Sequence, residues 1–510
     1  MPERQRTLRA TVQWSVGLLN DAELSLLEIS AVFVGGWNLS AAAQVAGLEE
    51  DRALELSEAL ARHSLIEFDN TGSEPRCRML ETIREFVAER LAVRPDAAEV
   101  QHRHAGAYRA LAEQADKQLR AGRISQWLER LDAEAGNLGA AVRWYLAHDP
   151  APLPQLFRVL WPLWFLRDIL GEGRSWVVQL LPAAGSFDHQ AQAELQWTAL
   201  VAALEVGDDG AAVAARRRLE TLLTGIADRF LRAVSQLAIA WSLPITGDLD
   251  GALRAASLSL KALRALDEPF WTALALGSLG GLETVVGQYD HAQRHLQEER
   301  SLGDRFGSAF LSSWSVATLG AVAVARGQLR EAQALLGEAL ELSLAASSTR
   351  SVALSLGAYA RLALAEGDPK RATLLAGATN GILQRAGLQS WPTTRQAETD
   401  LVTEVSQELG PDLFDQVFAD GELLSRQDAV AEVRDWWPSL PARREPQPVT
   451  RAGLRQLKPA SPDLPAARTL GSASARPRSC EPVSGGSRWN LPSTMVTATW
   501  PAASGQRRCR

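Results

Sequence analysis

Apolar and polar residues alternate at helical spacing over most of the chain, and a glycine-opened motif recurs every 40 residues. The motif reads GDDGAA, GDLDGA, GQYDHA, GQLREA and GDPKRA, and an alanine stands five residues after each glycine. Apolar residues at 3.6-residue spacing on both sides of each motif predict two helices joined by a tight turn. A degenerate sixth copy, DILGEG, is expected from Asp168. The turns are expected at Gly207, Gly247, Gly287, Gly327 and Gly367.

Hairpins of this kind must stack, because a single hairpin cannot bury its apolar face and about three or more copies are needed. Seven residues before the turn, four copies carry another small residue, which lets the two helices approach closely: Ala240, Gly280, Gly320 and Ala360. This order of small residue, glycine and alanine resembles the tetratricopeptide repeat, stretched from about 34 to 40 residues. We therefore expect a mainly α protein with a tetratricopeptide-like α-solenoid over residues 166–440.

The first 93 residues follow a different pattern. Apolar periodicity predicts helices over 8–19, 22–32, 39–46 and 51–63. The apolar-polar segments 65–68 and 76–79 flank the turn residues 70–73 and predict a short β-hairpin, followed by a helix over 81–91. Helices followed by a hairpin are typical of a winged helix. We expect a winged-helix domain over 1–93 and a helical connector over 94–165.

The charge of this domain argues against direct DNA binding. The segment expected to serve as recognition helix, EEDRALELSEALARH at 49–63, is most acidic at its N-terminal end, where a groove-reading helix needs basic and amide groups. The whole chain has a net charge of −7, and residues 445–510 carry ten basic and three acidic side chains, which leaves −14 on residues 1–444. Binding of nucleic acid by this chain alone is not expected.

The C-terminal segment 441–510 lacks helical periodicity. Nine of the 24 prolines fall within its last 66 residues, which are otherwise rich in Arg, Ala, Ser and Gly. Such a composition cannot bury enough apolar surface to offset the entropy of ordering. Two interpretations stay open: a disordered tail, or the product of a shifted reading frame.

Signals of catalysis or cofactor binding are weak. There is no GxSxG, HExxH or GxxxxGK[ST] motif, and three cysteines exclude a disulfide scaffold and a four-thiolate metal site. His291 and His295 lie four residues apart and could share a metal-binding helix face, but no third ligand is evident, so a solvated helix is favoured. His102 and His104 are expected at the surface, and Asn137 is expected as a cap or hairpin feature and not as a catalytic group. We expect neither an enzyme nor a bound cofactor or metal.

Four side chains are candidates for a binding groove. In tetratricopeptide-like geometry the first helix of each hairpin lines the concave face, and counting from the turn glycines places Trp197, Trp241, Trp314 and Arg361 on that face. Aromatic and arginine side chains are typical anchors of peptide-binding or helix-binding surfaces. Packing between repeats is the alternative role for each tryptophan.

Several segments together resemble the large ATP-dependent LuxR-type and AfsR-like transcriptional regulators of bacteria, members of the signal-transducing NTPase group. The resemblance covers roughly residues 4–435, and its blocks stand in the order of the family. They are RQRTLRATVQWS at 4–15, AVFVGGWNLSAA at 31–42, RCRMLETIREFVAERL at 76–91, WLERLDAEAGNLGAAVRWYL at 127–146, LLAGA at 374 and DQVFADGELLSRQDAV at 415–430.

The chain departs from that family in three places. The family's nucleotide-binding domain precedes the RQRTL-like segment, and this sequence begins there without a phosphate-binding loop. A Met-His-Asp-like triplet, whose histidine senses the nucleotide phosphate in many relatives, corresponds here to Met79, Leu80 and Glu81. The helix-turn-helix expected after residue 435 is replaced by the proline-rich segment. The resemblance thus covers the middle of a regulator.

The leading hypothesis is a non-enzymatic, signal-receiving module that binds a protein, a peptide or a small effector in the solenoid groove. The alternative is a transcription factor that binds DNA directly through the winged helix. A metal hydrolase is the least favoured hypothesis. Oligomerisation is compatible with the sequence. The most apolar run, residues 159–166, is too short for a membrane span, and the N-terminus lacks a secretory signal, so cytoplasmic localisation is expected.

Overall fold

The computed structural model describes residues 3–70, 74–168 and 170–436. They belong to one compact unit, Met1–Pro441. The expectation of a disordered or frame-shifted tail falls on residues outside this description. No helix among the described residues is both long and apolar enough to cross a membrane.

The N-terminal region has the predicted order of elements. The predicted hairpin is present as two short antiparallel strands that pair Phe68 with Cys77. Trp37 forms an isolated antiparallel β-bridge with Cys77 of the second strand. The two backbones exchange two hydrogen bonds, at 2.9 and 2.7 Å. Gly36 allows this approach, because a Cβ there would lie 2.7 Å from the Cys77 carbonyl oxygen. The elements are α1 (Glu3–Val16), α2 (Asp21–Ile29), η1 (Ser30–Val32), α3 (Leu39–Ala46), α4 (Glu50–Arg62), β1 (Glu67–Asp69), β2 (Arg76–Arg78) and α5 (Glu81–Ala92).

Four helices follow the winged helix over the residues predicted as a connector. The last of them, α9, packs against α6 and also against α10 (Leu170–Leu180) and α11 (His189–Val206). The apolar run at residues 159–166 forms the end of α9 and is fully buried, which explains its hydrophobicity without a membrane. The connector helices are α6 (Ala97–Arg120), α7 (Ile124–Ala133), α8 (Ala135–His148) and α9 (Leu153–Leu166).

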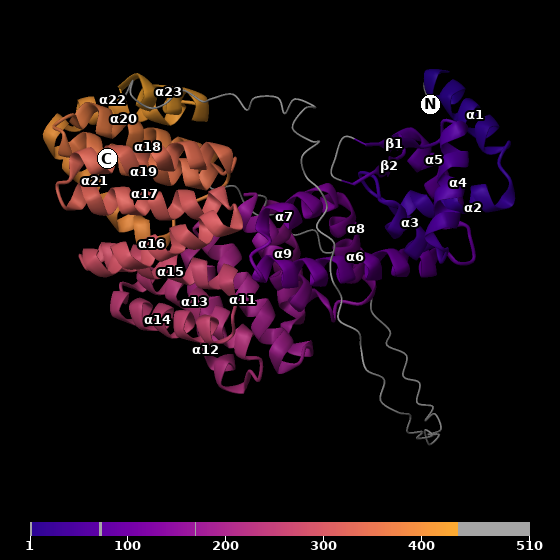
Figure 1. Cartoon of the computed structure of the whole chain (residues 1–510), viewed down its shortest axis with the longest axis horizontal. Coiled ribbons are helices and arrows are strands. Elements are labelled where there is room, and N and C mark those ends of the chain that lie inside the picture. The colour runs from indigo at the N-terminus through magenta and orange to yellow at the C-terminus, as the bar shows by residue number, and fades with distance from the viewer. Residues whose placement is uncertain (1–2, 71–73, 169, 437–510) are drawn as a thin grey trace, which may run out of the picture. The chain divides into compact units, whose positions relative to one another are not determined.

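Stacked α-hairpins form residues 189–385 (Figure 1). In each of the five clear copies the predicted turn glycine has a left-handed φ between 71° and 82°, a conformation that favours glycine. The alanine five residues later is fully buried in every copy. The paired helices are α11 (His189–Val206) with α12 (Asp209–Leu222), α13 (Arg229–Ser242) with α14 (Leu249–Ala265), α15 (Pro269–Val285) with α16 (Tyr289–Phe306), α17 (Ala309–Ala325) with α18 (Leu329–Ala345), and α19 (Thr349–Ala365) with α20 (Pro369–Arg385).

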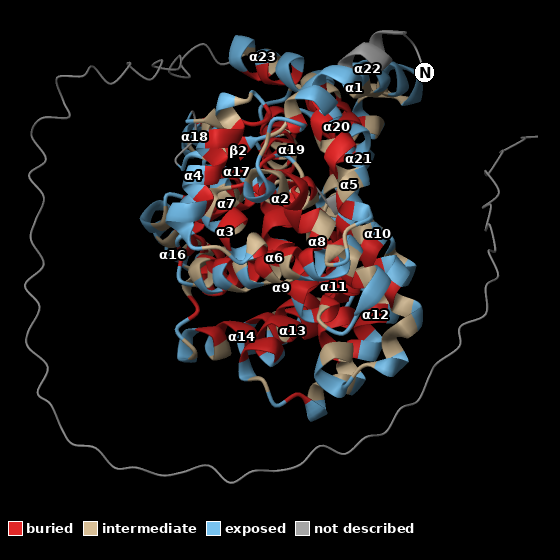
Figure 2. Ribbon diagram, turned by 90° about the vertical axis from the view of Figure 1, so that its right-hand side faces the viewer, coloured by how far each residue is buried: buried red, intermediate tan, exposed pale blue. Residues whose placement is uncertain are grey.

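The turns between hairpins follow the same 40-residue period. Asp267, Gly307, Ser347 and Gly387 all have left-handed φ values, from 54° to 67°. This second set of turns has no common residue type that would predict it, because only two of its four positions are glycine. Buried residues lie on helix faces that meet one another, and exposed residues lie on the outer faces (Figure 2).

The degenerate copy at Asp168 is also a turn between helices, α9 and α10 (Leu170–Leu180). After the fifth hairpin the chain leaves the repeat pattern and forms three more helices. The first of them packs against α13 and α15, far back along the sequence. These last helices are α21 (Pro392–Leu409), α22 (Pro411–Leu423) and α23 (Arg426–Trp436).

Candidate functional site

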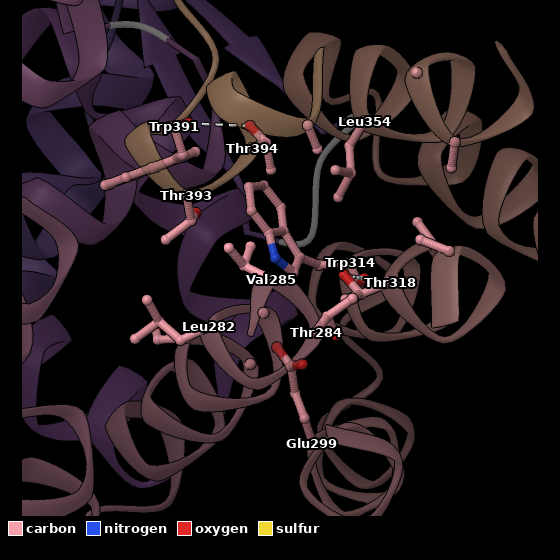
Figure 3. A pocket seen from close by; sticks show the side chains of 18 of the residues that line it. Leu282, Thr284, Val285, Glu299, Trp314, Thr318, Leu354, Trp391, Thr393 and Thr394 are labelled. Carbon is pink, nitrogen blue, oxygen red and sulfur yellow. Dashed lines mark hydrogen bonds between the residues drawn. The ribbon is translucent and has the colours of Figure 1, made fainter. Parts of the chain in front are cut away.

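A cavity of about 210 Å³ lies on the face formed by the first helices of the hairpins (Figure 3). Helices α13, α15, α17 and α19 line it, and α21 lies across it. It therefore combines four repeats with a segment that follows them.

The cavity exists because small residues occupy positions where large ones would fill it. The α15 and α17 residues that face it include Gly277, Gly281, Ala317 and Ala321, and α19 contributes Gly357. At Gly281 an added Cβ would meet nothing within 4 Å, so this glycine faces open space. Glycine in the middle of a helix is destabilising by roughly 0.5–1 kcal/mol relative to alanine. At Gly281 no close packing contact requires a glycine, so packing does not explain why the helix carries this destabilising residue. A requirement for the open cavity would explain it.

Aromatic rings form part of the cavity walls. Trp314 of α17 is half-buried, and its ring stands near the centre of the cavity (Figure 3). Trp241 and Trp391 lie against each other with ring centroids 5.3 Å apart, and Phe165 packs on Trp391 at 6.1 Å. These walls offer flat apolar surfaces that suit the body of an organic ligand.

Two carboxyl groups and one guanidinium face the cavity. Glu299 of α16 is only 2% exposed, and its Oε2 atom has no hydrogen-bond partner among the described residues. Burial raises the pKa of Glu299 well above its ordinary value. Burial also raises the pKa of Glu398, although hydrogen bonds from Ser390 and Thr394 oppose this. The site is therefore apolar with an excess of acidic groups.

Three of the four predicted groove residues line this cavity. Trp241 is nearly buried and donates a hydrogen bond from Nε1 to Ser278 Oγ at 2.7 Å. Arg361 donates to Glu404 Oε2 at 3.0 Å and to the Ala397 carbonyl at 2.5 Å. Arg361 thus holds α21 in place, and Trp314 is the aromatic residue most open to a ligand.

The prediction for Trp197 was wrong. This side chain is fully buried, and its Nε1 donates to the Val234 carbonyl at 3.0 Å. Trp161 of α9 packs on it with ring centroids 5.3 Å apart and also contacts Trp241 and Trp271. Helix α9 therefore covers the inner face at the first hairpin, so packing and not binding explains Trp197.

Sequence reasoning missed Glu299 and the α21 residues of the site. Glu299 lies on a second helix, and the repeat geometry assigns only first helices to the groove. Helix α21 lies beyond the last repeat, so the 40-residue period says nothing about its position. The cluster Gly277, Gly280 and Gly281 within one predicted helix was a signal that could have indicated the cavity.

The histidine candidates have structural roles. Glu283 accepts a hydrogen bond from His295 at 2.8 Å, and no group of three or more His, Cys, Asp or Glu side chains in the described ranges could hold a metal. His102 is exposed, as predicted, and stacks on Trp144 with centroids 5.1 Å apart. The prediction for His104 was wrong, because this ring is buried between Phe33 and Tyr108.

Asn137 joins the connector to the winged helix and does not cap a helix, contrary to the sequence-based expectation. Its Oδ1 accepts from the Val34 backbone at 2.7 Å, and its Nδ2 donates to the Gly36 carbonyl and to Glu134, both at 2.8 Å. Glu134 also pairs with Arg76 of β2. This buried network fixes the winged helix on α8.

The solvent face of α4 is acidic, as the sequence predicted. Its first turn carries Glu50 and Asp51, and Glu55 and Glu58 are also exposed. Arg52 is paired with Glu55 at 2.7 Å. The solvent face of α4 thus offers few basic side chains that could contact the phosphates of DNA.

Comparisons with known proteins relate the chain to regulators. Residues 19–92, which span α2 to α5, match the family model of a winged helix-turn-helix domain. The chain is 31% identical over 358 residues to a Mycobacterium tuberculosis protein provisionally named an HTH-type transcriptional regulator. That alignment covers 66% of this chain and 39% of the relative, so the chain spans about two fifths of the relative's length. An uncharacterized protein of the same species is 33% identical over 122 residues, 23% of this chain and 30% of that one.

Two solved structures match large parts of the chain at low sequence identity. A signal transduction ATPase with numerous domains (STAND) from Pyrococcus horikoshii, with a tetratricopeptide repeat sensor, has a TM-score of 0.44 at 16% identity. The match covers 82% of this chain and 64% of that one. A Rap protein complexed with competence and sporulation factor has a TM-score of 0.40 at 11% identity, over 66% of this chain and 100% of that one.

Proposed function

We propose that this chain is the non-enzymatic, signal-receiving part of a LuxR-type transcriptional regulator in the cytoplasm. A protein, a peptide or a small effector would bind on the inner face of the solenoid. The observation that carries the proposal is the cavity lined by α13, α15, α17 and α19. Half-buried Trp314 lines it, and so does Glu299, whose Oε2 atom has no hydrogen-bond partner among the described residues. Sequence similarity to HTH-type regulators supports the regulatory role.

Ligand binding would act through α21. This helix contacts α13, α15 and α19, and it is held across the cavity by Arg361. A ligand that fills the cavity would favour one position of α21 over others, which is the differential binding that a switch requires. In a longer protein that also contains a nucleotide-binding domain and a DNA-binding domain, this shift would be the input signal.

A pair of glycine variants tests the proposal in the native bacterium. Gly281→Leu places a side chain in the cavity, and Gly106→Leu is its matched control, because Gly106 also lies within a helix, is similarly half-exposed and has open space around it. We expect transcript profiles in which Gly281→Leu reproduces deletion of the gene and Gly106→Leu reproduces the wild type.

Two results would contradict the proposal. A deletion strain with unchanged transcripts would refute a regulatory role. A deletion that changes transcripts, together with a Gly281→Leu strain identical to the wild type, would show that the signal does not pass through the cavity.

A further inference from the structure

We propose that the cavity takes a small, mostly apolar organic cation, such as a protonated amine, whose charged head pairs with Glu299. This inference rests on the proposed function in one respect, namely that the cavity is the effector site. It adds the chemical class of the effector.

The position of Glu299 is the first argument. Its helix, α16, is the second helix of a hairpin, yet Glu299 lines the cavity together with residues of the first helices. Gly277 makes this possible, because a Cβ at position 277 would overlap the Glu299 carboxyl group. In Figure 3 the side chain points from α16 toward the cavity. The carboxyl group is therefore placed toward the ligand space by a specific gap in the first helix.

The lack of a partner is the second argument. The neighbouring charged residues of α16 are engaged elsewhere: Glu298 pairs with Arg264 at 2.5 Å, and Arg300 with Glu338 at 2.6 Å. Buried carboxyl groups are ordinarily paired or hydrogen-bonded, since an unsatisfied polar group costs about 1–3 kcal/mol. A ligand that donates a charge-assisted hydrogen bond to Glu299 would remove this cost.

The remaining groups favour a cation over an anion. The basic residue that lines the cavity, Arg361, is already bound to Glu404 and to a backbone carbonyl. Glu398 adds a second carboxyl group to the lining. Among the described lining residues, an anionic ligand would therefore meet two carboxyl groups and a guanidinium that already has an acidic partner. The Trp314 ring adds a π-face, which attracts ammonium groups.

The size of the cavity limits the ligand. An apolar cavity of about 150 Å³ holds one benzene molecule. A cavity of about 210 Å³ therefore has room for a single ring with a short chain. Such a ligand would place its ring against Trp314 and its amine at Glu299.

Three probes with the same phenyl ring and chains of four carbons test the charge preference: 4-phenylbutylamine, 4-phenylbutan-1-ol and 4-phenylbutyrate. Their binding to the full chain is measured by ligand-observed NMR titration up to millimolar concentration at neutral pH. We expect the amine to bind at least tenfold more tightly than the alcohol, and the carboxylate to bind most weakly. Gly281→Leu should weaken the binding of all three, because it fills the cavity.

Adjacent glutamates supply the matched variants. Glu299→Gln keeps the size and a carbonyl acceptor but cannot become a carboxylate when the amine binds, so the preference for the amine over the alcohol should disappear. Glu298→Gln removes an exposed carboxylate on the outer face and should keep the preference. Thermal unfolding shows whether both variants are folded, and Gly277→Ala, which displaces the Glu299 carboxyl group, gives a second measurement if Glu299→Gln is not.

The inference is overturned if no probe binds, if the alcohol binds as tightly as the amine, or if Glu298→Gln and Glu299→Gln lose the preference equally. These failures differ from a failure of the proposed function. Equal binding of amine and alcohol, with an altered transcript profile for Gly281→Leu, would keep the regulatory cavity and refute only the cationic ligand.

Discussion

At the scale of single residues, glycine has two opposite roles in the first helices. Gly280 and Gly320 stand one repeat apart, and a Cβ at either position would lie 2.6 or 2.5 Å from the leucine of the following helix, Leu296 or Leu336. These glycines allow close helix packing, as their spacing before the turn predicted. Gly281, next to Gly280, faces open space. Adjacent glycines in one helix thus serve packing and the cavity respectively.

This difference predicts different stabilities for two leucine variants. Gly320→Leu and Gly281→Leu gain similar helix propensity, but the former must displace fully buried Leu336. Overpacking of a buried site costs typically about 1–3 kcal/mol. We expect the free energy of unfolding from urea titration to be about 2 kcal/mol lower for Gly320→Leu than for Gly281→Leu. Equal values would contradict the packing role of Gly320.

At the scale of elements, a buried polar network joins the winged helix to the connector. His104 Nε2 lies 3.4 Å from Asn137 Oδ1, the atom that also accepts from the Val34 backbone. Burial lowers the pKa of His104 to about 4, and the hydrogen bond to Asn137 opposes this shift. The imidazole is thus neutral in the folded chain at neutral pH.

The contribution of this polar network to the free energy of unfolding should decrease at acidic pH. Because the pKa of His104 is lower in the folded chain than its usual value near 6.5, the unfolded chain binds more protons below pH 6.5. The stabilising contribution is complete above pH 6.5 and is lost as the pH falls toward 4, by about 1.4 kcal/mol per pH unit at most. We expect His104→Gln to flatten the pH dependence of the unfolding free energy over that range.

The control for this measurement is His102→Gln. His102 is exposed and stacks on Trp144, outside the network. Its replacement should leave the pH dependence of the wild type unchanged. A wild-type slope in the His104→Gln variant would show that other groups cause the acid sensitivity.

At the scale of the whole described unit, contacts between distant segments bring the start of the solenoid to its end. Asp168, in the turn after α9, accepts a hydrogen bond from the Thr349 backbone at 2.7 Å and from Ser348 Oγ at 3.2 Å. It thereby adds to the capping of α19, whose N-cap residue is Ser348. Arg350 of α19 is buried and pairs with Glu205 of α11. These contacts join elements separated by four hairpin turns.

Replacement of Asp168 should therefore loosen a distant helix. Loss of an N-cap costs about 0.5–2 kcal/mol, and we expect Asp168→Ala to fall at the upper end because it also removes a contact between remote hairpins. Hydrogen exchange should accelerate in residues 349–352. Asp208→Ala is the control, since Asp208 caps its own helix, α12, through Ala211 at 3.0 Å. If hydrogen exchange in Asp168→Ala became faster only near residue 168, and not in residues 349–352, Asp168 would have no capping role at α19.

Local sequence was sufficient for the elements. The 40-residue period identified the turns and the buried alanines, since the left-handed turn and the close helix contact each require a particular residue type. It also pointed to three residues that line the cavity, Trp241, Trp314 and Arg361. It failed for Trp197, because the covering of the first hairpin by α9 depends on contacts between residues 36 or more positions apart.

The sequence by itself determined the winged helix, the stacked hairpins and the acidic character of α4, because these follow from local periodicity, turn chemistry and charge. Tertiary structure alone decided where the cavity lies, since α21 closes it from outside the repeats and Glu299 enters it from a second helix through the gap at Gly277. Such a site depends on which distant faces meet, and no short-range pattern encodes that.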